Sequence, residues 1–177
     1  MTADVWGIVA LVGLLLVNAF FVAAEFSIIA ARRSQIEPRA HAGSRAAKTA
    51  LYAMEHAALM LATTQLGITM ASIGLGWIGE PALASLVQPF LTAVPVGIAE
   101  ATAHSIAVAV AFALITSLHI TLGELAPKTI ALERAEATAL LVVKPTEVFM
   151  KTFWPFIKLL NGMGRAVVNM LGMSSRG

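Results

Sequence analysis

Long uninterrupted runs of apolar residues dominate the chain. A helical residue advances about 1.5 Å, so a hydrocarbon layer of about 30 Å takes roughly 20 apolar residues. Three stretches meet that length, residues 5–31, 57–79 and 101–123. Arg32 and Arg33 end the first stretch, and Glu124 ends the third. The pattern predicts three transmembrane helices.

The second stretch is interrupted by glycines, including Gly67, Gly74 and Gly79. Irregular backbone at membrane depth must be buried in protein or line a cavity, so we expect a bent or broken helix packed against other helices. The segment Pro81–Ala99 is also uncharged but contains three prolines. Because proline removes a hydrogen-bond donor and clashes with the preceding turn, this segment predicts a re-entrant or interfacial hairpin and not a fourth span.

The residues on the C-terminal side of the third stretch remain apolar but carry a base at every seventh position: Lys144, Lys151, Lys158 and Arg165. Such spacing predicts juxtamembrane amphipathic helices over about 129–172, lying in the headgroup layer and divided at Pro145 and Pro155. A fourth span is the alternative, and it would bury lysines in the membrane. We expect residues 36–55 to form a pair of short cytoplasmic helices.

Composition supports an all-α integral membrane protein. The chain has 177 residues, of which 58% are hydrophobic and 12% charged, and its mean hydropathy is +0.82. This length predicts one domain, residues 1–177. The absence of cysteine excludes disulfide scaffolds and thiolate metal sites. The net charge of +2 is small, and the basic residues form no stripe along the chain, so we expect no nucleic-acid partner. No His-Glu-x-x-His motif occurs, and we expect no enzyme activity.

The basic residues set the orientation. They follow the first and third stretches, none precedes the first, and none lies between the second and third. Since cytoplasmic flanks are enriched in Lys and Arg, the N-terminus is expected outside and the C-terminus in the cytoplasm, after three crossings.

Each predicted span carries one polar stripe at helical spacing. Ionisable groups inside a membrane usually face an interior cavity, and amide, hydroxyl and carboxylate oxygens are the ligands that Mg²⁺ prefers. A cation-binding cavity is therefore one hypothesis, and hydrogen bonding between helices is the other. For the glutamates, pairing with Arg32 or Lys128 is a further alternative. The stripes are Asn18 and Glu25; Gln65, Thr69, Ser72 and Gly76; and Ser117, Thr121 and Glu124.

The densest local signal is Gly123-Glu124-Leu125-Ala126-Pro127-Lys128. Pro127 removes the hydrogen bond to the Gly123 carbonyl and disturbs that turn, which can aim the carbonyl or Glu124 at a cation. Lys128 then stands at the cytoplasmic interface, where it can contact an anion. His119, one turn earlier, is a proton carrier, a ligand or a packed imidazole.

Three linked motifs resemble one family. They are Asn18-Ala-Phe-Phe-Val-Ala-Ala-Glu25-Phe, Gln65-Leu-Gly-Ile-Thr-Met-Ala-Ser72-Ile-Gly-Leu-Gly-Trp-Ile-Gly-Glu80-Pro81 and His119-Ile-Thr-Leu-Gly-Glu124-Leu-Ala-Pro127-Lys128. Their order and spacing resemble the transmembrane domain of the CorB/CorC and CNNM family, over essentially the whole chain.

The resemblance implies a homodimer of three-span subunits in a bacterial or archaeal plasma (inner) membrane. It implies Mg²⁺ transport or efflux, with Na⁺ exchange as one possible coupling, through an acidic cavity open to the cytoplasm. The implied cation ligands are Asn18, Glu25, Ser72, Gly74 and Glu124. Family members continue into a CBS-domain pair that binds ATP and a small C-terminal domain; these are expected in the full-length protein and absent from this chain. The alternative function is a membrane scaffold or Mg²⁺ sensor that transports nothing.

Overall fold

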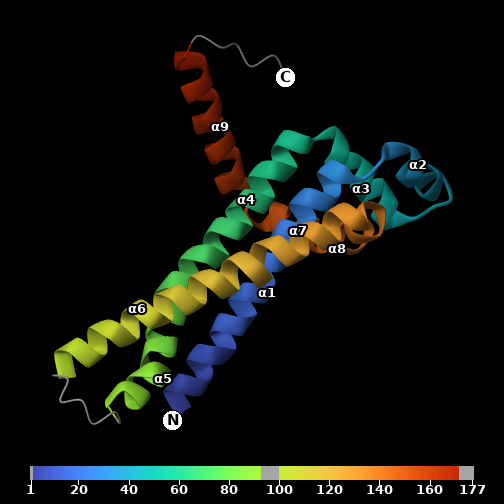
Figure 1. Ribbon diagram of the computed structural model, residues 1–177. Helices are drawn as coiled ribbons and strands as arrows, with labels where there is room; N and C mark the ends of the chain where they lie inside the picture. The colour runs from blue at the N-terminus through green and yellow to red at the C-terminus, as the bar shows by residue number, and fades with distance from the viewer. Residues whose placement is uncertain (1, 93–99, 172–177) are drawn as a thin grey trace. The chain divides into compact units, whose positions relative to one another are not determined.

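The computed structural model describes residues 2–92 and 100–171, and in these residues all regular structure is helical. This confirms the all-α prediction. Two short π-helical segments, η1 and η2, interrupt the α-helices, which are labelled α1 to α9 in Figure 1. The elements are α1 (Thr2–Ala30), α2 (Arg33–His41), α3 (Arg45–Glu55), α4 (Ala57–Gly74), η1 (Leu75–Gly79), α5 (Glu80–Thr92), α6 (Glu100–Leu118), η2 (His119–Leu125), α7 (Ala126–Glu133), α8 (Ala135–Thr152) and α9 (Trp154–Met170).

Three helical stretches in the described part of the chain are long and apolar enough to cross a membrane: Val5–Ala30, Ala57–Val87 and His104–Glu133. The prediction of three spans, the second of them broken, is confirmed. The second and third stretches continue beyond the expected ends at residues 79 and 123, because each π segment joins the two helices that flank it. A π segment thus disturbs the α-helical repeat without ending the span.

The segment predicted as a hairpin, Pro81–Ala99, is helical from Pro81 to Thr92, and residues 93–99 lie outside the described residues. Pro81 is the second residue of α5 and directly follows η1, so its missing N–H falls where the backbone has just left the regular α-helical hydrogen-bond pattern. Pro89 lies within α5. In the described residues the segment forms no separate fourth candidate span, in agreement with the prediction, and its first residues extend the second span.

The chain divides into two compact units that interleave along the sequence. The first contains α1 up to Phe20 and, from Ile68 to Pro127, the end of α4, η1, α5, α6 and η2. The second contains the rest of α1, helices α2 and α3, the start of α4 and the chain from Lys128 onward. Each unit is described by itself below.

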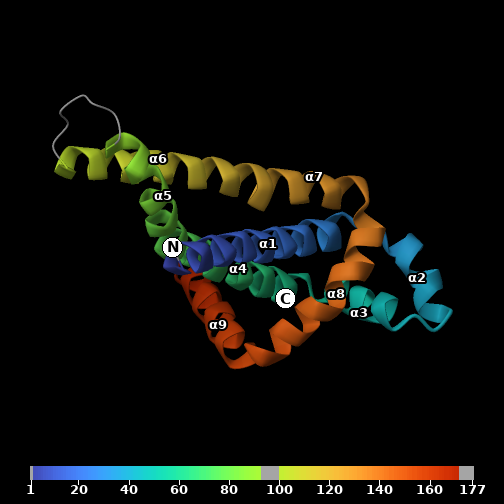
Figure 2. The same ribbon diagram turned by 90° about the horizontal axis from the view of Figure 1, so that it is seen from below.

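The first unit has a small apolar core of Leu11, Leu75 and Ile115, from α1, η1 and α6. Gly79 permits this packing, because a Cβ there would lie 3.1 Å from a Leu11 methyl and 3.3 Å from an Ile115 methyl. Helix α5 packs along α6, and both views show the two helices side by side (Figures 1 and 2). The α5–α6 pair and the core hold η1 and η2 within the same unit.

The second unit contains the predicted cytoplasmic helix pair as α2 and α3, which pack on each other, and α3 also packs on α8. Ile36, Ala47, Val143 and Ile157 are fully buried in its core. The Ser44 hydroxyl accepts a hydrogen bond from the Ala47 N–H and so caps α3.

The C-terminal helices break at Arg134 and Phe153, and α8 and α9 meet at a sharp bend (Figure 2). Pro155 lies in the first turn of α9, as its predicted role requires. Pro145 was expected to end a helix but lies inside α8. The carbonyl that Pro145 leaves without a partner belongs to Leu141, whose side chain is 78% exposed, so that turn lies on the outer face of the unit.

Ion pairs connect α8 to a neighbouring segment and also form between residues of α8 itself. Arg32 Nε donates to Glu136 at 3.0 Å. Glu147 accepts hydrogen bonds from Lys151 at 2.8 Å and from Lys144 at 3.1 Å, and Thr49 of α3 donates to the same carboxylate at 3.3 Å. Two of the four regularly spaced bases are therefore neutralised within α8.

The Glu147 cluster predicts an acid-sensitive contribution to stability. The hydrogen bond from Lys151, and next that from Lys144, holds the pKa of Glu147 below its ordinary value in the folded chain. Its stabilisation is present above the ordinary glutamate pKa of about 4.3 and is lost as pH falls through the lowered pKa. Thermal unfolding measured from about pH 6 to about pH 3 is expected to depend less steeply on pH in Glu147→Gln than in the parent. Equal slopes would show that the cluster does not couple to folding.

Candidate functional site

A buried asparagine is the centre of the polar cluster in the first unit. Asn18 is 0% exposed, although it lies in a long apolar helix. Its Nδ2 donates to the Gly123 carbonyl at 2.9 Å, and its Oδ1 accepts from the Ser72 hydroxyl at 3.2 Å. One side chain of α1 is thus bonded to both the second and the third spans.

The Gly123 carbonyl is available because of local sequence. Pro127 has no N–H to donate to it, and the helix here is π-helical, with the Ala126 N–H donating to the Thr121 carbonyl. The expectation that Pro127 disturbs this turn is confirmed. The freed Gly123 carbonyl meets the Asn18 amide.

His119 extends the cluster towards a carboxylate. Its Nε2 lies 3.3 Å from the Ser72 Oγ and 3.8 Å from Glu124 Oε1. The Ser72 hydroxyl has one proton. It can donate that proton to Asn18 Oδ1 while accepting a hydrogen bond from His119 Nε2–H, or donate it to His119 Nε2 in the tautomer in which that nitrogen carries no proton. The Glu124 side chain is 49% exposed and that of His119 is 20% exposed. The cluster therefore runs from a buried amide to an accessible acid.

Glycines make room for this arrangement. A Cβ on Gly123 would lie 2.8 Å from His119 Cδ2 and 3.1 Å from Asn18 Nδ2. A Cβ on Gly74 would lie 3.1 Å from two methyl groups of Leu14, so Gly74 lets α1 and the end of α4 approach each other. Gly74 belongs to the same unit as Asn18 and Ser72, and it acts there through backbone packing.

The cluster offers four kinds of oxygen: amide, hydroxyl, backbone carbonyl and carboxylate. Mg²⁺ prefers such oxygens in octahedral geometry and usually keeps several waters. In residues 2–92 and 100–171, no group of three or more His, Asp or Glu side chains is placed to hold a metal ion. A cation here would be held by neutral oxygens and water, with Glu124 supplying the negative charge.

The predicted site residues are divided between the two units. Glu25 and Gln65 belong to the second unit, while Thr69, Gly76, Ser117 and Thr121 lie exposed in the first. The Ser117 hydroxyl donates to the Ala113 carbonyl of its own helix at 2.8 Å. Lys128 Nζ lies 4.4 Å from the centre of the Phe26 ring, a cation–π distance.

Sequence reasoning missed Thr64. This residue is 0% exposed and donates a hydrogen bond to Glu25 Oε2 at 3.1 Å, within the second unit. The predicted polar stripe began at Gln65, one residue and about 100° of helical rotation away. The available signal was the apolar spacing of α4, which places Thr64 on the same buried face as Met60 and Ala71.

The sequence is similar to a known family and to several curated proteins. Residues 9–177 match the family model described as the cyclin M transmembrane N-terminal domain. UPF0053 protein YhdT of Bacillus subtilis (strain 168) is 42% identical over 164 residues, covering 92% of this chain and 35% of the relative. UPF0053 protein YugS of the same organism is 39% identical, with 95% and 39% covered. Uncharacterized protein Rv1841c of Mycobacterium tuberculosis is 40% identical, with 94% and 47% covered.

The chain spans between about a third and a half of the length of these curated relatives. The matches nevertheless cover almost all of this chain, including every residue of the cluster around Asn18. The family model and the motifs that contain Asn18, Ser72 and Glu124 lead to the same assignment. The chain belongs to the cyclin M (CNNM) transmembrane domain family, the group that includes the CorB/CorC proteins.

Proposed function

We propose that the chain is the membrane domain of a divalent-cation transporter and that it binds Mg²⁺, as the transported ion, at the cluster of Asn18, Ser72, Gly123 and Glu124. Membership of the cyclin M family supports a transport role. The observation that carries the proposal is the fully buried Asn18 amide, bonded to a freed carbonyl on one span and to a hydroxyl on another.

In the proposed mechanism the Ser72 hydroxyl acts as a switchable donor. When it turns from Asn18 to His119 Nε2, it releases Asn18 Oδ1 and offers its own lone pairs to a cation. The Asn18 Nδ2 contact with Gly123 holds the amide in place throughout. Glu124 supplies the charge that partly dehydrated Mg²⁺ requires, and its exposure allows the ion to reach it from water.

We also propose that the protein is a homodimer in a bacterial or archaeal plasma membrane, with the C-terminus in the cytoplasm. The distribution of basic residues supports this orientation. Exposed Thr121, and Gly76 with open space around its Cα, support close approach of a second subunit, because small residues let helices pack closely in lipid. Exchange with Na⁺ is the coupling we propose for transport.

A second candidate function is a Mg²⁺-binding scaffold or sensor, in which the same cluster binds the ion but nothing crosses the membrane. The hydrogen bonds that join the three elements favour it, since a bound ion would also hold those elements together. Mg²⁺ flux into or out of liposomes that depends on the protein would exclude this alternative.

Thermal unfolding of the purified protein against Mg²⁺ tests the site. A ligand that binds only the folded state stabilises it by about 2.7 kcal/mol at 100 times its dissociation constant. The parent is expected to show a saturable rise in Tm with Mg²⁺. Glu124→Gln removes the charge and keeps the shape, and we expect it to lower the affinity for Mg²⁺ by about tenfold or more.

Glu133→Gln is the matched control, because Glu133 is an exposed carboxylate on α7, outside the cluster. It is expected to respond to Mg²⁺ like the parent. A rise in Tm that Ca²⁺ or raised ionic strength reproduces equally, or one that survives unchanged in Glu124→Gln, would contradict the proposed site.

A further inference from the structure

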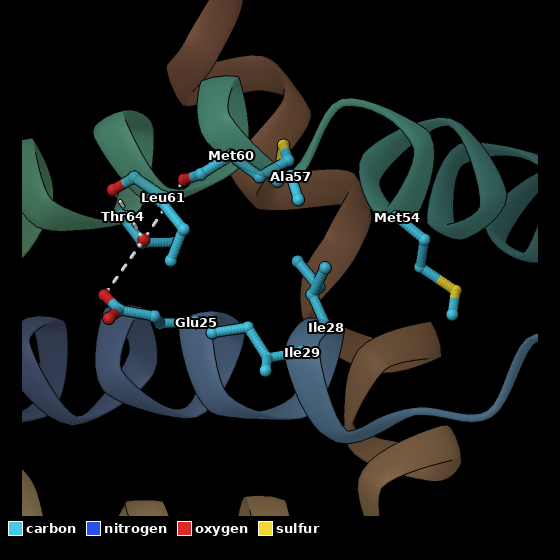
Figure 3. A pocket seen from close by; sticks show the side chains of 8 residues that line it. All are labelled: Glu25, Ile28, Ile29, Met54, Ala57, Met60, Leu61 and Thr64. Carbon is cyan, nitrogen blue, oxygen red and sulfur yellow. Dashed lines mark hydrogen bonds between the residues drawn. The ribbon is translucent and has the colours of Figure 1, made fainter. Parts of the chain in front are cut away.

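The second unit contains a pocket of a different kind. It has a volume of about 230 Å³ and is lined by residues of α1, α3 and the start of α4 (Figure 3). The lining is apolar except for Glu25 and Thr64, and consists of these two with Ile28, Ile29, Met54, Ala57, Met60 and Leu61. Ile29 and Leu61 are also exposed at the surface, at 59% and 39%, so the pocket can be reached from outside.

The carboxylate in this pocket is incompletely partnered. Figure 3 shows Glu25 pointing from α1 towards Thr64, whose hydroxyl is 3.1 Å from Glu25 Oε2. The same hydroxyl is 3.1 Å from each of the Met60 and Leu61 carbonyls, and its single proton is shared among the three acceptors. Within the described ranges no Lys, Arg or His forms an ion pair with Glu25, so this carboxyl group can take a cationic partner in an otherwise apolar wall.

A bare metal ion does not suit this lining. Mg²⁺ usually keeps several waters, which need polar partners, and the side chains of this lining offer the Glu25 carboxylate and the Thr64 hydroxyl to hold both the ion and those waters. The remaining walls are branched alkyl, thioether and methyl groups, which bind apolar matter and tolerate no charge of their own. The site matches a ligand that is cationic at one end and apolar elsewhere.

We propose that this pocket binds an ammonium group carried on an apolar chain, with Glu25 as the anionic partner of the ammonium. The volume corresponds to roughly eight water molecules at about 30 Å³ each, which suits an ammonium and about six carbons. The carbons pack against Ile28, Met60 and Leu61, and the polar end donates to Glu25. This site is separate from the proposed Mg²⁺ cluster and does not depend on it.

The pocket lies at the end of the first candidate span and at the start of the second. That level suits an amphiphile, because the charged group stays near water while the chain enters lipid. Two sources share the ammonium group: a free alkylamine, and the ethanolamine headgroup of a membrane lipid, of which the ammonium and its two carbons would enter the pocket while the phosphate stays outside.

The test uses n-hexylammonium and methionine NMR on the whole chain in detergent, with ¹³C-labelled methionine methyl groups. The signals of Met54 and Met60, which line the pocket, are expected to shift saturably, while those of Met163 and Met170 on α9 report partition into the micelle. Glu25→Gln is expected to weaken the apparent affinity about tenfold or more, because it removes a charge-assisted hydrogen bond. Glu133→Gln should leave it unchanged.

Three outcomes would overturn the proposal. One is that n-hexanol, which has the chain without the charge, shifts Met54 and Met60 as strongly as the amine. Another is that Glu25→Gln titrates like the parent while its unfolding temperature shows it to be folded. The third is that Mg²⁺ shifts these two signals in a Glu25-dependent manner and the amine does not, which would return Glu25 to a metal site.

Nanodiscs distinguish the two sources. If a lipid headgroup is the ligand, discs containing phosphatidylethanolamine will shift Met54 and Met60 relative to discs of phosphatidylcholine alone, and added hexylammonium will then have little effect. If free amines are the ligand, the two kinds of disc will give the same spectrum and the same titration. A pocket filled by leucine at Ala57 should abolish either response.

Discussion

Asn18→Leu is expected to abolish the Mg²⁺-dependent rise in Tm and to destabilise the protein as well. Leucine has a similar size but neither donates nor accepts, so the buried Gly123 carbonyl loses its partner. An unsatisfied buried polar group costs about 1–3 kcal/mol, and the free energy of unfolding should fall by about that amount. Thermal unfolding with and without Mg²⁺ measures both effects in one experiment.

Ser72→Ala separates the two effects. It removes the hydroxyl at the cluster but keeps the Asn18–Gly123 hydrogen bond, so its loss of stability should be smaller, about 1 kcal/mol or less, while Mg²⁺ binding weakens. If Asn18→Leu unfolded like the parent and still responded to Mg²⁺, the asparagine would be neither a structural link nor a ligand.

Gly123→Ala is expected to damage the site by sterics alone. The new methyl group would lie 2.8 Å from His119 Cδ2, which no relaxed structure tolerates, so the imidazole must move. Overpacking of this kind costs about 1–3 kcal/mol, and we expect Mg²⁺ affinity to fall about tenfold or more, because His119 no longer meets Ser72. Thermal unfolding and Mg²⁺ titration measure the two consequences.

Gly13→Ala is the matched control, since Gly13 lies in α1 of the same unit and a Cβ there would meet nothing within 4 Å. Alanine favours helix over glycine by about 1 kcal/mol, so this variant should be as stable as the parent or slightly more so. Equal behaviour of the two alanine variants would show that the space beside Gly123 is not needed.

Much of the fold follows from local pattern. Uncharged runs of spanning length predicted the three spans, and the helix pair of α2 and α3 follows from the charged segment between the first two. One error came from a proline. Pro145 was expected to end a helix but lies inside α8 on an outer face, and sequence alone does not show which carbonyls lie at the surface.

The candidate site was partly predictable for a related reason. Asn18, Ser72, His119 and Glu124 were identified because polar residues are conspicuous in apolar helices, and the role of Pro127 follows from its missing N–H. Thr64 was missed. Gln65 and Thr69, which the sequence placed in a polar stripe, are exposed in the structure. The spacing of residues shows which of them share a face of a helix, but only the packing of that helix decides which face is buried.

The π-helical segment η2 gives the third span an unusual evolutionary property. A π turn holds about one residue more than the α turn it replaces, so losing a single codon from His119–Leu125 would restore a regular helix while α6 and α7 keep their faces. The span would survive, and loss of Glu124 or Leu125 would place Lys128 in place of Pro127 four residues after Gly123, so that the Gly123 carbonyl could bond within the helix. The proposed ion site can therefore be gained or lost by one small insertion or deletion, without redesign of the membrane anchor.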